Sequence, residues 1–473
     1  MLETSKEWTT VQQTFKKIWG YEDLRETQRE IVTSLLQGQD SLAIMATGGG
    51  KSICFQLPAL LNEGLTLVVS PLLALMEDQV RDLKARNLPA AALHSNLSQM
   101  ERREVIRNLP NTRLLYISPE TLLSPPVWEK LSDRHLKISG LMLDEAHCLV
   151  QWGDSFRPSY RRLGAVRSAL MQSKPDSHGR IALAAFTATA DRETTAELQT
   201  CLNMHNPKIV RTSPYRSNLS LKVAIAWTPA GRKSRTLKFI RDRKGQSGLI
   251  YVRSRRDAET LATWLQENSF QTAAYHAGLS SQERRHVEQQ WLTNKYAFVI
   301  CTSAFGLGIN KPDTRWVLHF HPPLTLSEYI QEIGRAGRDD QPAEALMLVS
   351  EPTGLLDDSD RQRVDFFIQQ QQKLHRQALS LLPKLPRQGN FAEVTKLYPD
   401  AAIALGLLHR LGNLTWHTPF IYEIHNLPDT QQKLKRDIED RSGDQRMIVQ
   451  MQAFIHTRRD RWNFLLNAFD CAE

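Results

Sequence analysis

Cysteine is scarce in this chain of 473 residues, which holds five in all: Cys54, Cys148, Cys201, Cys301 and Cys471. They are widely scattered and form no Cys-x-x-Cys pair, so the sequence supports neither a disulfide scaffold nor a zinc knuckle. Long apolar runs are missing as well, since none approaches the ~20 residues that a membrane-spanning helix needs. No internal repeat of short fixed period is visible either. These absences leave a soluble globular protein with buried free thiols.

The composition of residues 1–20 and the overall charge limit where the protein acts and which partners it has. Residues 1–20 are polar and hold both Glu and Lys, unlike a secretory signal, so we expect a cytoplasmic protein with no membrane partner. The net charge of +9 and the pI near 9.3 favour a polyanionic partner. A generally basic soluble enzyme is the alternative that charge alone leaves open.

Strand-like and helical runs alternate through most of the chain. In the first 212 residues, strands are expected at 41–45, 65–70, 113–117, 138–143, 181–186 and 208–210, with helices between them. Residues 213–218 have turn composition, and a second alternating series then continues to about residue 350. Alternation of this kind predicts parallel sheets with helices on both faces. Two such units in tandem suggest a duplicated nucleotide-binding fold whose working site lies in the cleft between them.

The last part of the chain, residues 351–473, has a different character. It is mainly helical, with two short helices expected within 391–412 and two short strands at 414–417 and 420–425. Helices followed by a small hairpin resemble a winged helix-turn-helix, which often binds nucleic acid. A helical bundle that stabilises the second unit is an equally open alternative.

A glycine-rich stretch after the first strand carries the chemistry around which the chain is organised. Three successive glycines before a helix let backbone N–H groups converge on a phosphate. Lys51 would reach the β- and γ-phosphates, and the Ser52 hydroxyl would bind Mg²⁺. The strict pattern has glycine where Met45 stands, and a glycine-rich turn without a nucleotide is the alternative. The residues expected to bind nucleotide here are Thr47, Gly48, Gly49, Gly50, Lys51 and Ser52.

A second site candidate is the apolar run at 141–143, which ends in Asp144-Glu-Ala-His147. Paired carboxylates after a strand are what a Mg²⁺-nucleotide enzyme requires. Asp144 would hold Mg²⁺, Glu145 would polarise the attacking water, and His147 completes the catalytic group. The alternative for Asp144 and Glu145 is to cap the next helix.

With these motifs the sequence resembles superfamily 2 helicases, and specifically the RecQ family of DNA helicases. Tyr21, Arg25 and Gln28 resemble the adenine-reading segment of that family, in which Gln28 would contact the adenine edge and the other two would pack on the ring. The stretch 148–160 resembles the family's aromatic-rich loop, which couples DNA contact to ATP hydrolysis. Its resemblance assigns DNA contacts to Trp152, Phe156 and Arg157, because aromatic faces stack on exposed bases.

The aromatic-rich loop also departs from the family. Residues 153–156 read Gly-Asp-Ser-Phe where the family has Gly-His-Asp-Phe. The missing histidine bears on how strongly DNA is coupled to hydrolysis. The family's zinc module, which needs four cysteines after residue 338, is absent too, because only Cys471 remains there.

Further resemblances lie in the second alternating unit. Residues 301–313 resemble motif V, in which Thr302 would touch a DNA phosphate, and residues 331–338 resemble motif VI. The resemblance implies that Arg335 and Arg338 neutralise charge on the γ-phosphate. Their spacing of three predicts that both lie on one helix face.

The sequence therefore predicts an α/β protein with two tandem RecA-like domains, at 1–212 and 213–350, and a mainly helical, winged-helix-like region at 351–473. The resemblance implies an ATP-dependent 3′–5′ DNA helicase of recombination and repair that uses ATP and Mg²⁺ but no zinc. Single-stranded and forked duplex DNA are the expected partners of a monomer. An RNA helicase or a translocase without strand separation is the first alternative, and a non-enzymatic DNA-binding regulator is the second.

Overall fold

The computed structural model describes residues 6–46, 48–151, 158–174, 180–305, 311–425, 444–458 and 460–471. The chain divides into two compact units. The first comprises Met1–Thr212 and Gln371–Asp440, and the second comprises Ser213–Gln370 and Arg441–Glu473. The residues of the expected C-terminal region, 351–473, are thus shared between the two units. None of the described helices combines the length and the apolarity that crossing a bilayer requires.

The first unit is built on a parallel sheet of seven strands, in the order β3-β4-β2-β5-β6-β1-β7. The strands are β1 (Ser41–Ile44), β2 (Leu65–Val69), β3 (Ala90–Leu93), β4 (Leu114–Ile117), β5 (Ile138–Leu143), β6 (Ala182–Thr187) and β7 (Lys208–Arg211). Most of these strands are buried along their whole length, because helices cover both faces of the sheet. The predicted parallel sheet is confirmed, and β3 is a strand that the sequence did not reveal.

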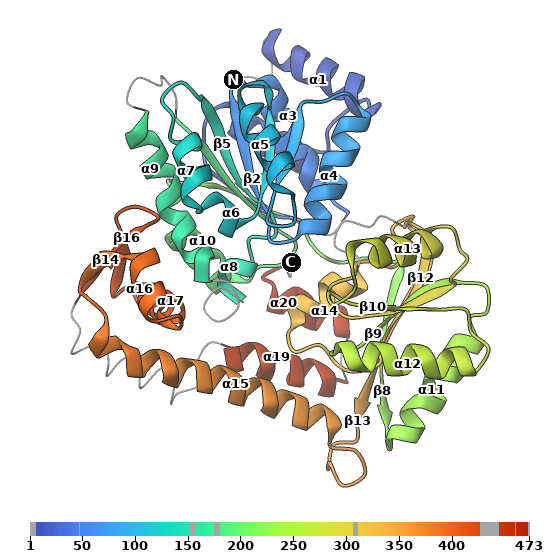
Figure 1. Ribbon diagram of the computed structural model, residues 1–473. Coiled ribbons are helices and arrows are strands. Elements are labelled where there is room, and N and C mark those ends of the chain that lie inside the picture. Colours follow the sequence, from blue (N-terminus) through green and yellow to red (C-terminus); the bar gives the residue numbers. More distant parts are fainter. Residues whose placement is uncertain are drawn as a thin grey trace. The chain divides into compact units, whose positions relative to one another are not determined.

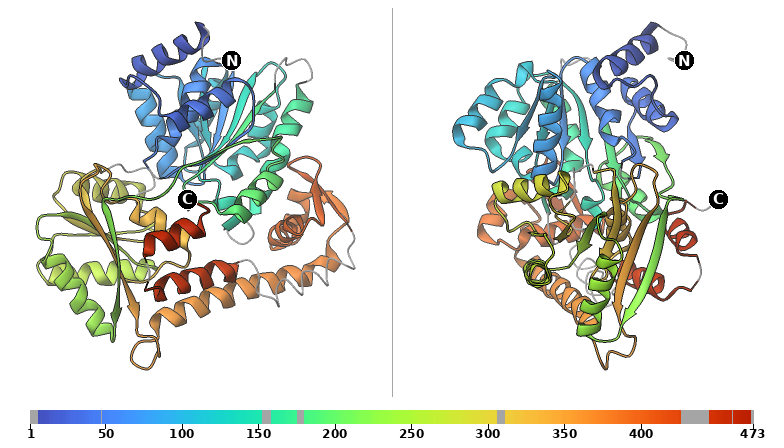
Figure 2. Two further views of the ribbon diagram at one scale, coloured as in Figure 1. Left: turned by 180° about the vertical axis from the view of Figure 1, so that it is seen from behind. Right: turned by 90° about the vertical axis from the view of Figure 1, so that its right-hand side faces the viewer.

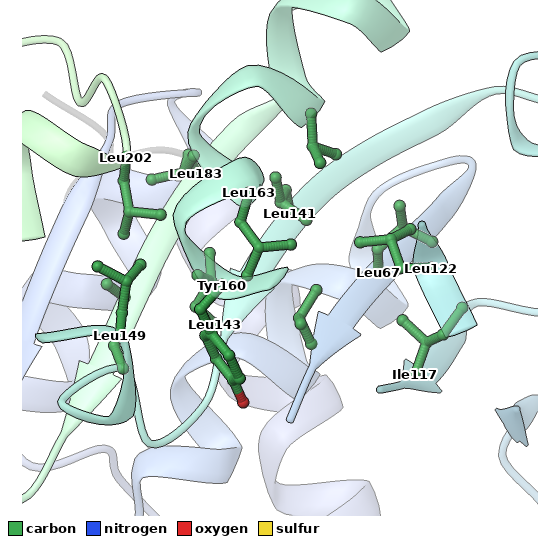
Figure 3. Close-up of a cluster of buried hydrophobic side chains, with 14 of the residues drawn as sticks. Leu67, Ile117, Leu122, Leu141, Leu143, Leu149, Tyr160, Leu163, Leu183 and Leu202 are labelled. Atoms are coloured by element: carbon green, nitrogen blue, oxygen red, sulfur yellow. The ribbon is translucent and has the colours of Figure 1, made fainter. Parts of the chain in front are cut away.

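Two layers of helices enclose this sheet (Figure 1). Up to residue 212, the described helices are α1 (Lys6–Trp19), α2 (Glu26–Leu36), α3 (Lys51–Leu61), α4 (Leu73–Ala85), α5 (Gln99–Arg107), α6 (Pro119–Leu122), α7 (Pro125–Leu131), α8 (Cys148–Gln151), α9 (Val166–Ser173) and α10 (Arg192–Cys201), with the 3₁₀ turns η2 (Leu109–Asn111) and η3 (Pro158–Ala165). Helices α2, α3 and α4 pack on one face of the sheet. On the other face, Leu67, Leu141 and Leu143 of the strands meet Tyr160 and Leu163 (Figure 3).

The second unit has a parallel sheet of six strands, in the order β10-β11-β9-β12-β13-β8. They are β8 (Leu219–Ala226), β9 (Ser247–Tyr251), β10 (Ala274–Tyr275), β11 (Phe298–Cys301), β12 (Thr314–His319) and β13 (Ala343–Ser350). The helices are α11 (Pro229–Arg241), α12 (Arg255–Glu267), α13 (Ser281–Leu292), α14 (Leu326–Ile333), α19 (Asp444–His456) and α20 (Arg461–Ala468). The long strands β8 and β13 lie side by side (Figure 2). Met451, Phe454 and Leu465 from the end of the chain are part of this unit's core.

The remaining element follows the long helix α15 (Ser359–Leu381) and belongs to the first unit. It consists of η4 (Leu382–Lys384), β14 (Gln388–Asn390), α16 (Phe391–Leu397), α17 (Ala401–Arg410), β15 (Leu414–Trp416) and β16 (Ile421–Ile424). The three strands form an antiparallel sheet in the order β14-β16-β15. The two predicted helices and the hairpin are confirmed, and we call residues 388–424 the winged element.

Candidate active site

The glycine-rich loop joins β1 to α3, and its geometry requires glycine. Gly48 and Gly50 have φ angles of 85° and 79°, in the left-handed region. Gly50 is the N-cap of α3, so the helix begins at Lys51 and its first N–H groups are left without helical acceptors. Thr47 lies outside the described residues. The loop therefore has the form that binds a phosphate at a helix N-terminus.

Gln28 ties the expected adenine-reading segment to this loop. Its side chain is buried, and Nε2 donates to the Gly49 carbonyl at 3.2 Å while Oε1 accepts from the Arg25 N–H at 3.0 Å. A Cβ atom on Gly50 would lie 2.3 Å from Gln28 Nε2, so another residue here would displace the Gln28 side chain from the loop. Tyr21 is 62% exposed and leaves a ring face available to a ligand.

Two buried carboxylates follow β5 directly. Asp144 and Glu145 are 7% and 8% exposed, and Glu145 has a φ of 50°, an unusual conformation for a residue with a side chain. Glu145 Oε1 lies 3.5 Å from Lys51 Nζ. Burial and the charge of Glu145 raise the pKa of Asp144 to about 6. Lys51 and His147 both lie near Glu145, and the oxygens of Asp144 and Glu145 are of the kind that bind a divalent cation.

A hydrogen-bonded chain leads from the carboxylates to the next strand. His147 Nδ1 lies 3.3 Å from Glu145 Oε2 and 3.1 Å from Thr187 Oγ1. Thr187 Oγ1 in turn donates to the Thr189 carbonyl at 3.1 Å. Thr187 ends β6, the strand between β5 and β1, so the sheet order itself brings these groups together.

The residues present fit a triphosphate with Mg²⁺. Lys51 Nζ is buried and makes no hydrogen bond within the described part of the chain, so it retains donors for phosphate oxygens. The Ser52 hydroxyl and Asp144 supply oxygen ligands of the kind that Mg²⁺ prefers. The structure thus brings Gln28, Lys51 and Asp144 together with the other residues predicted for the first unit: Gly48, Gly49, Gly50, Ser52, Glu145 and His147.

In the second unit, Arg335 and Arg338 lie in a turn and do not share a helix face. Helix α14 ends at Ile333, with Gly334 as its C-cap, and Gly337 has a φ of 62°. The prediction of a common helix face is therefore wrong, because the helix ends at Ile333 and Gly337 takes a left-handed conformation between the two arginines. Arg335 is 7% exposed, and its Nε has no hydrogen-bond partner in the described residues. Burial, with the neighbouring charge of Arg335, lowers the pKa of Arg338 to about 9.

A buried ionic network in the same unit was not predicted. Glu332 Oε2 accepts from Arg253 Nη2 at 2.7 Å and lies 2.8 Å from His319 Nε2. Burial alone would raise the pKa of Glu332, but Arg253 and His319 hold it below its usual range. The network joins β12 and the residues just after β9 to helix α14. Glu332 stands within the stretch that resembles motif VI, which was the available signal.

The predicted DNA contacts are only partly described. Thr302 directly follows β11, and its N–H donates to the Tyr275 carbonyl at 3.1 Å. Trp152, Phe156 and Arg157 lie outside the described residues. Their roles remain predictions from the sequence.

Known proteins resemble the chain over nearly all of its length. Residues 25–198 match the DEAD/DEAH box helicase family, and residues 232–340 match the helicase conserved C-terminal domain. The chain is 51% identical to the ATP-dependent DNA helicase RecQ of Synechocystis, a match covering 97% of this chain and 94% of that protein. It is 40% identical to the probable ATP-dependent DNA helicase RecS of Bacillus subtilis, a match covering 72% of this chain and 67% of that protein.

A solved structure shares the fold. Dbp5 of S. cerevisiae, bound to RNA and ADP BeF3, superposes with a TM-score of 0.58 at 16% identity, covering 77% of this chain and 92% of that one. Two parallel-sheet units, a glycine-rich phosphate loop and an Asp-Glu-Ala-His strand end define a helicase of the DEAD/DEAH box class. At 51% identity over almost the whole chain, the protein belongs to the RecQ family.

Proposed function

We propose that the chain is an ATP-dependent DNA helicase that moves 3′ to 5′ along single-stranded DNA and separates duplexes during recombination and repair. The observation that carries this proposal is the approach of Lys51 to Glu145 beside the buried Asp144. That arrangement suits ATP hydrolysis, and the relatives at 51% and 40% identity bear the name of DNA helicases. The direction of movement rests on the family alone.

The residues of the first unit take the following roles. The glycine loop and Lys51 bind the β- and γ-phosphates, and Ser52 and Asp144 hold Mg²⁺, whose charge neutralises the phosphates. Glu145 orients the attacking water and accepts its proton. Tyr21 and Arg25 pack on the adenine ring. The bond from Gln28 to Gly49 then links adenine recognition to the phosphate loop.

The second unit supplies positive charge. Arg335 and Arg338 stabilise the charge that develops on the γ-phosphate, which is where a cation accelerates phosphoryl transfer. The proposed partners are single-stranded DNA and forked duplexes. Thr302 would contact their backbone, and Trp152, Phe156 and Arg157 would report an occupied strand to the hydrolytic site.

The test is ATP hydrolysis by the purified chain with and without single-stranded DNA. We expect DNA to stimulate hydrolysis in the wild type. Lys51→Ala should lower kcat about a hundredfold or more, because it removes a phosphate-binding cation, while DNA affinity stays measurable. Lys84→Ala, at an exposed lysine of α4, is the matched control and should behave as the wild type. A folded wild-type chain whose hydrolysis ignores DNA would refute the proposal.

Strand displacement separates DNA unwinding from its alternatives. A forked DNA duplex should be opened in the presence of ATP, and a matched RNA duplex should not. Efficient opening of RNA alone, or translocation without strand separation, would replace the proposed activity. The idea of a non-enzymatic winged-helix regulator is disfavoured by α17, none of whose residues is exposed.

A further inference from the structure

The first residues of the second unit hold the arginine turn, residues 334–341, in place. Arg216 Nη1 donates to the Ala336 carbonyl at 2.8 Å. Asn218 Nδ2 donates to the Gly337 carbonyl at 2.8 Å and to the Gln341 carbonyl at 2.9 Å. These bonds join positions about 120 residues apart in the chain. Residues 213–218, which have the composition of a simple hinge, therefore make specific contacts with motif VI.

The contact is close enough to restrict the residue type at its centre. A Cβ atom on Gly337 would lie 2.6 Å from Asn218 Nδ2, and the φ of Gly337 is 62°. The Gly337 N–H donates to the Thr314 carbonyl at 2.8 Å, so the turn is bound on two sides. Such a turn keeps Arg335 and Arg338 in fixed positions, because their backbone has few other conformations available.

The same contact gathers positive charge. Arg216, Arg335 and Arg338 are close enough that the first two help to depress the pKa of the third, after burial. Asp339 and Asp340 offset part of this charge, but Asp339 is paired with Arg315 at 2.6 Å. Arg216 thus adds positive charge next to Arg338.

Helix α20, near the end of the chain, contacts the residues on either side of Arg216. The Trp462 indole N–H donates to the Leu219 carbonyl at 2.9 Å, and the Trp462 ring meets Tyr215 edge to face at 5.4 Å. Helix α20 thus contacts residues on both sides of Arg216. The segment has fixed neighbours along its length, as a support for the arginine turn requires.

We propose that Arg216 is a positioning residue for ATP hydrolysis, which holds the turn that carries Arg335 and Arg338 and adds a third guanidinium to the cluster. This inference rests on the proposed function, since it assigns Arg216 to the same hydrolytic site. Arg216 acts through the Ala336 carbonyl and through its charge. It therefore affects the rate of the chemical step more than the binding of ATP.

The kinetic test compares Arg216→Ala, Arg216→Lys and the exposed control Arg241→Ala in the full chain. Arg216→Ala should lower the kcat of DNA-stimulated hydrolysis roughly 10- to 100-fold and change the KM for ATP less than about threefold. Arg216→Lys keeps a charge and a donor, so it should recover most of the kcat. Arg241→Ala should match the wild type. An unchanged kcat in Arg216→Ala overturns the inference.

Hydrogen exchange of residues 334–341 is a second readout that needs no activity. Their amides should exchange about fivefold faster in Arg216→Ala and in Asn218→Ala, since each loses bonds to the turn. Unchanged exchange overturns the positioning role, even in a chain without ATP hydrolysis. A wild type whose hydrolysis ignores DNA would instead refute the proposed function. If Arg216→Ala does not fold, Asn218→Ala carries both measurements.

Discussion

Buried ionisable side chains gather where strands end in both units. In the first unit, Asp144 and Glu145 follow β5 directly, and in the second unit His319 ends β12 next to Glu332. The carboxyl ends of parallel strands meet at one edge of a sheet, which is where α/β proteins bind ligands. Burying such groups away from water is unfavourable without partners, so their concentration at these edges indicates function more than stability.

His321 is a buried ionisable group whose environment opposes protonation. Burial lowers its pKa far below the usual range, and the guanidinium groups of Arg363, Arg232 and Arg253 lower it further. The nearest carboxylate, Asp257, lies 4.0 Å from His321 Nδ1 and also pairs with Arg363. The folded chain therefore keeps His321 neutral at pH values where an unfolded chain protonates it.

This difference predicts acid lability of the second unit. Below about pH 6.5 the unfolded chain binds a proton at this position and the folded chain does not, so stability falls as the pH falls. Between about pH 7.5 and pH 5.5 the contribution of His321 is about 1.4 kcal/mol. The fall in Tm from pH 7.5 to pH 5.5 should be about 3 °C smaller in His321→Gln than in the wild type. Thermal unfolding of both proteins at the two pH values measures it, and parallel pH curves would contradict it.

Helix α17 is the second helix of the winged element, and it is mostly apolar. Its sequence, Ala-Ala-Ile-Ala-Leu-Gly-Leu-Leu-His-Arg, is apolar except at its end, and Ala404, Leu405 and Leu408 are buried in the core of the winged element. An all-apolar helix is suited to burial and not to a DNA groove, which needs polar side chains for phosphates and base edges. Helix α17 therefore packs the core of the winged element.

Arg162 of η3 binds the winged element to the rest of the first unit. Its side chain is buried, its Nε donates to the Pro419 carbonyl at 2.6 Å, and its guanidinium lies 3.9 Å from the Phe391 ring centre and 5.6 Å from that of Phe420. Phe420 also meets Trp128 edge to face at 5.3 Å. Desolvated cation–π contacts and a charged hydrogen bond of this kind are strong.

Removing this guanidinium should loosen the winged element. Arg162→Ala should destabilise its packing by about 2 to 4 kcal/mol and speed hydrogen exchange in residues 414–424. Arg162→Lys keeps the charge but lacks the planar group that stacks on rings, so its stability and exchange rates should fall between those of the wild type and Arg162→Ala. The exposed Arg103→Ala, in α5, is the control. Equal exchange in Arg162→Ala and wild type would show that the element holds without this residue.

The sequence predicted the elements whose signals are local. The phosphate loop and the Asp-Glu-Ala-His strand end each carry their pattern within a dozen residues, and strand β5 spans the predicted residues 138–143. Strand β3 is Ala-Ala-Ala-Leu, a composition typical of helices, and becomes a strand because it pairs with β4. Pairs distant in sequence were not predictable. Arg216 lies 120 residues from Ala336, and Arg162 lies 257 from Pro419.

At the scale of the whole molecule, the chain beyond residue 350 does not form one separate body. The winged element is part of the first unit, and α19 and α20 complete the second unit's core with Met451, Phe454, Leu465 and Phe469. The apolar side chains of these segments supply the burial that drives their packing.

The last prediction follows from this division. In the described residues, no group of three or more His, Cys, Asp or Glu side chains is placed to hold a metal. We expect the purified chain to contain less than about 0.1 mol of zinc per mol, and a chelator to change its Tm by less than about 1 °C, because a structural zinc would contribute several kcal/mol. Elemental analysis and thermal unfolding with and without chelator measure this, with a zinc-dependent protein as positive control. Stoichiometric zinc, or a loss of stability on chelation, would mean that residues beyond those described complete a metal site.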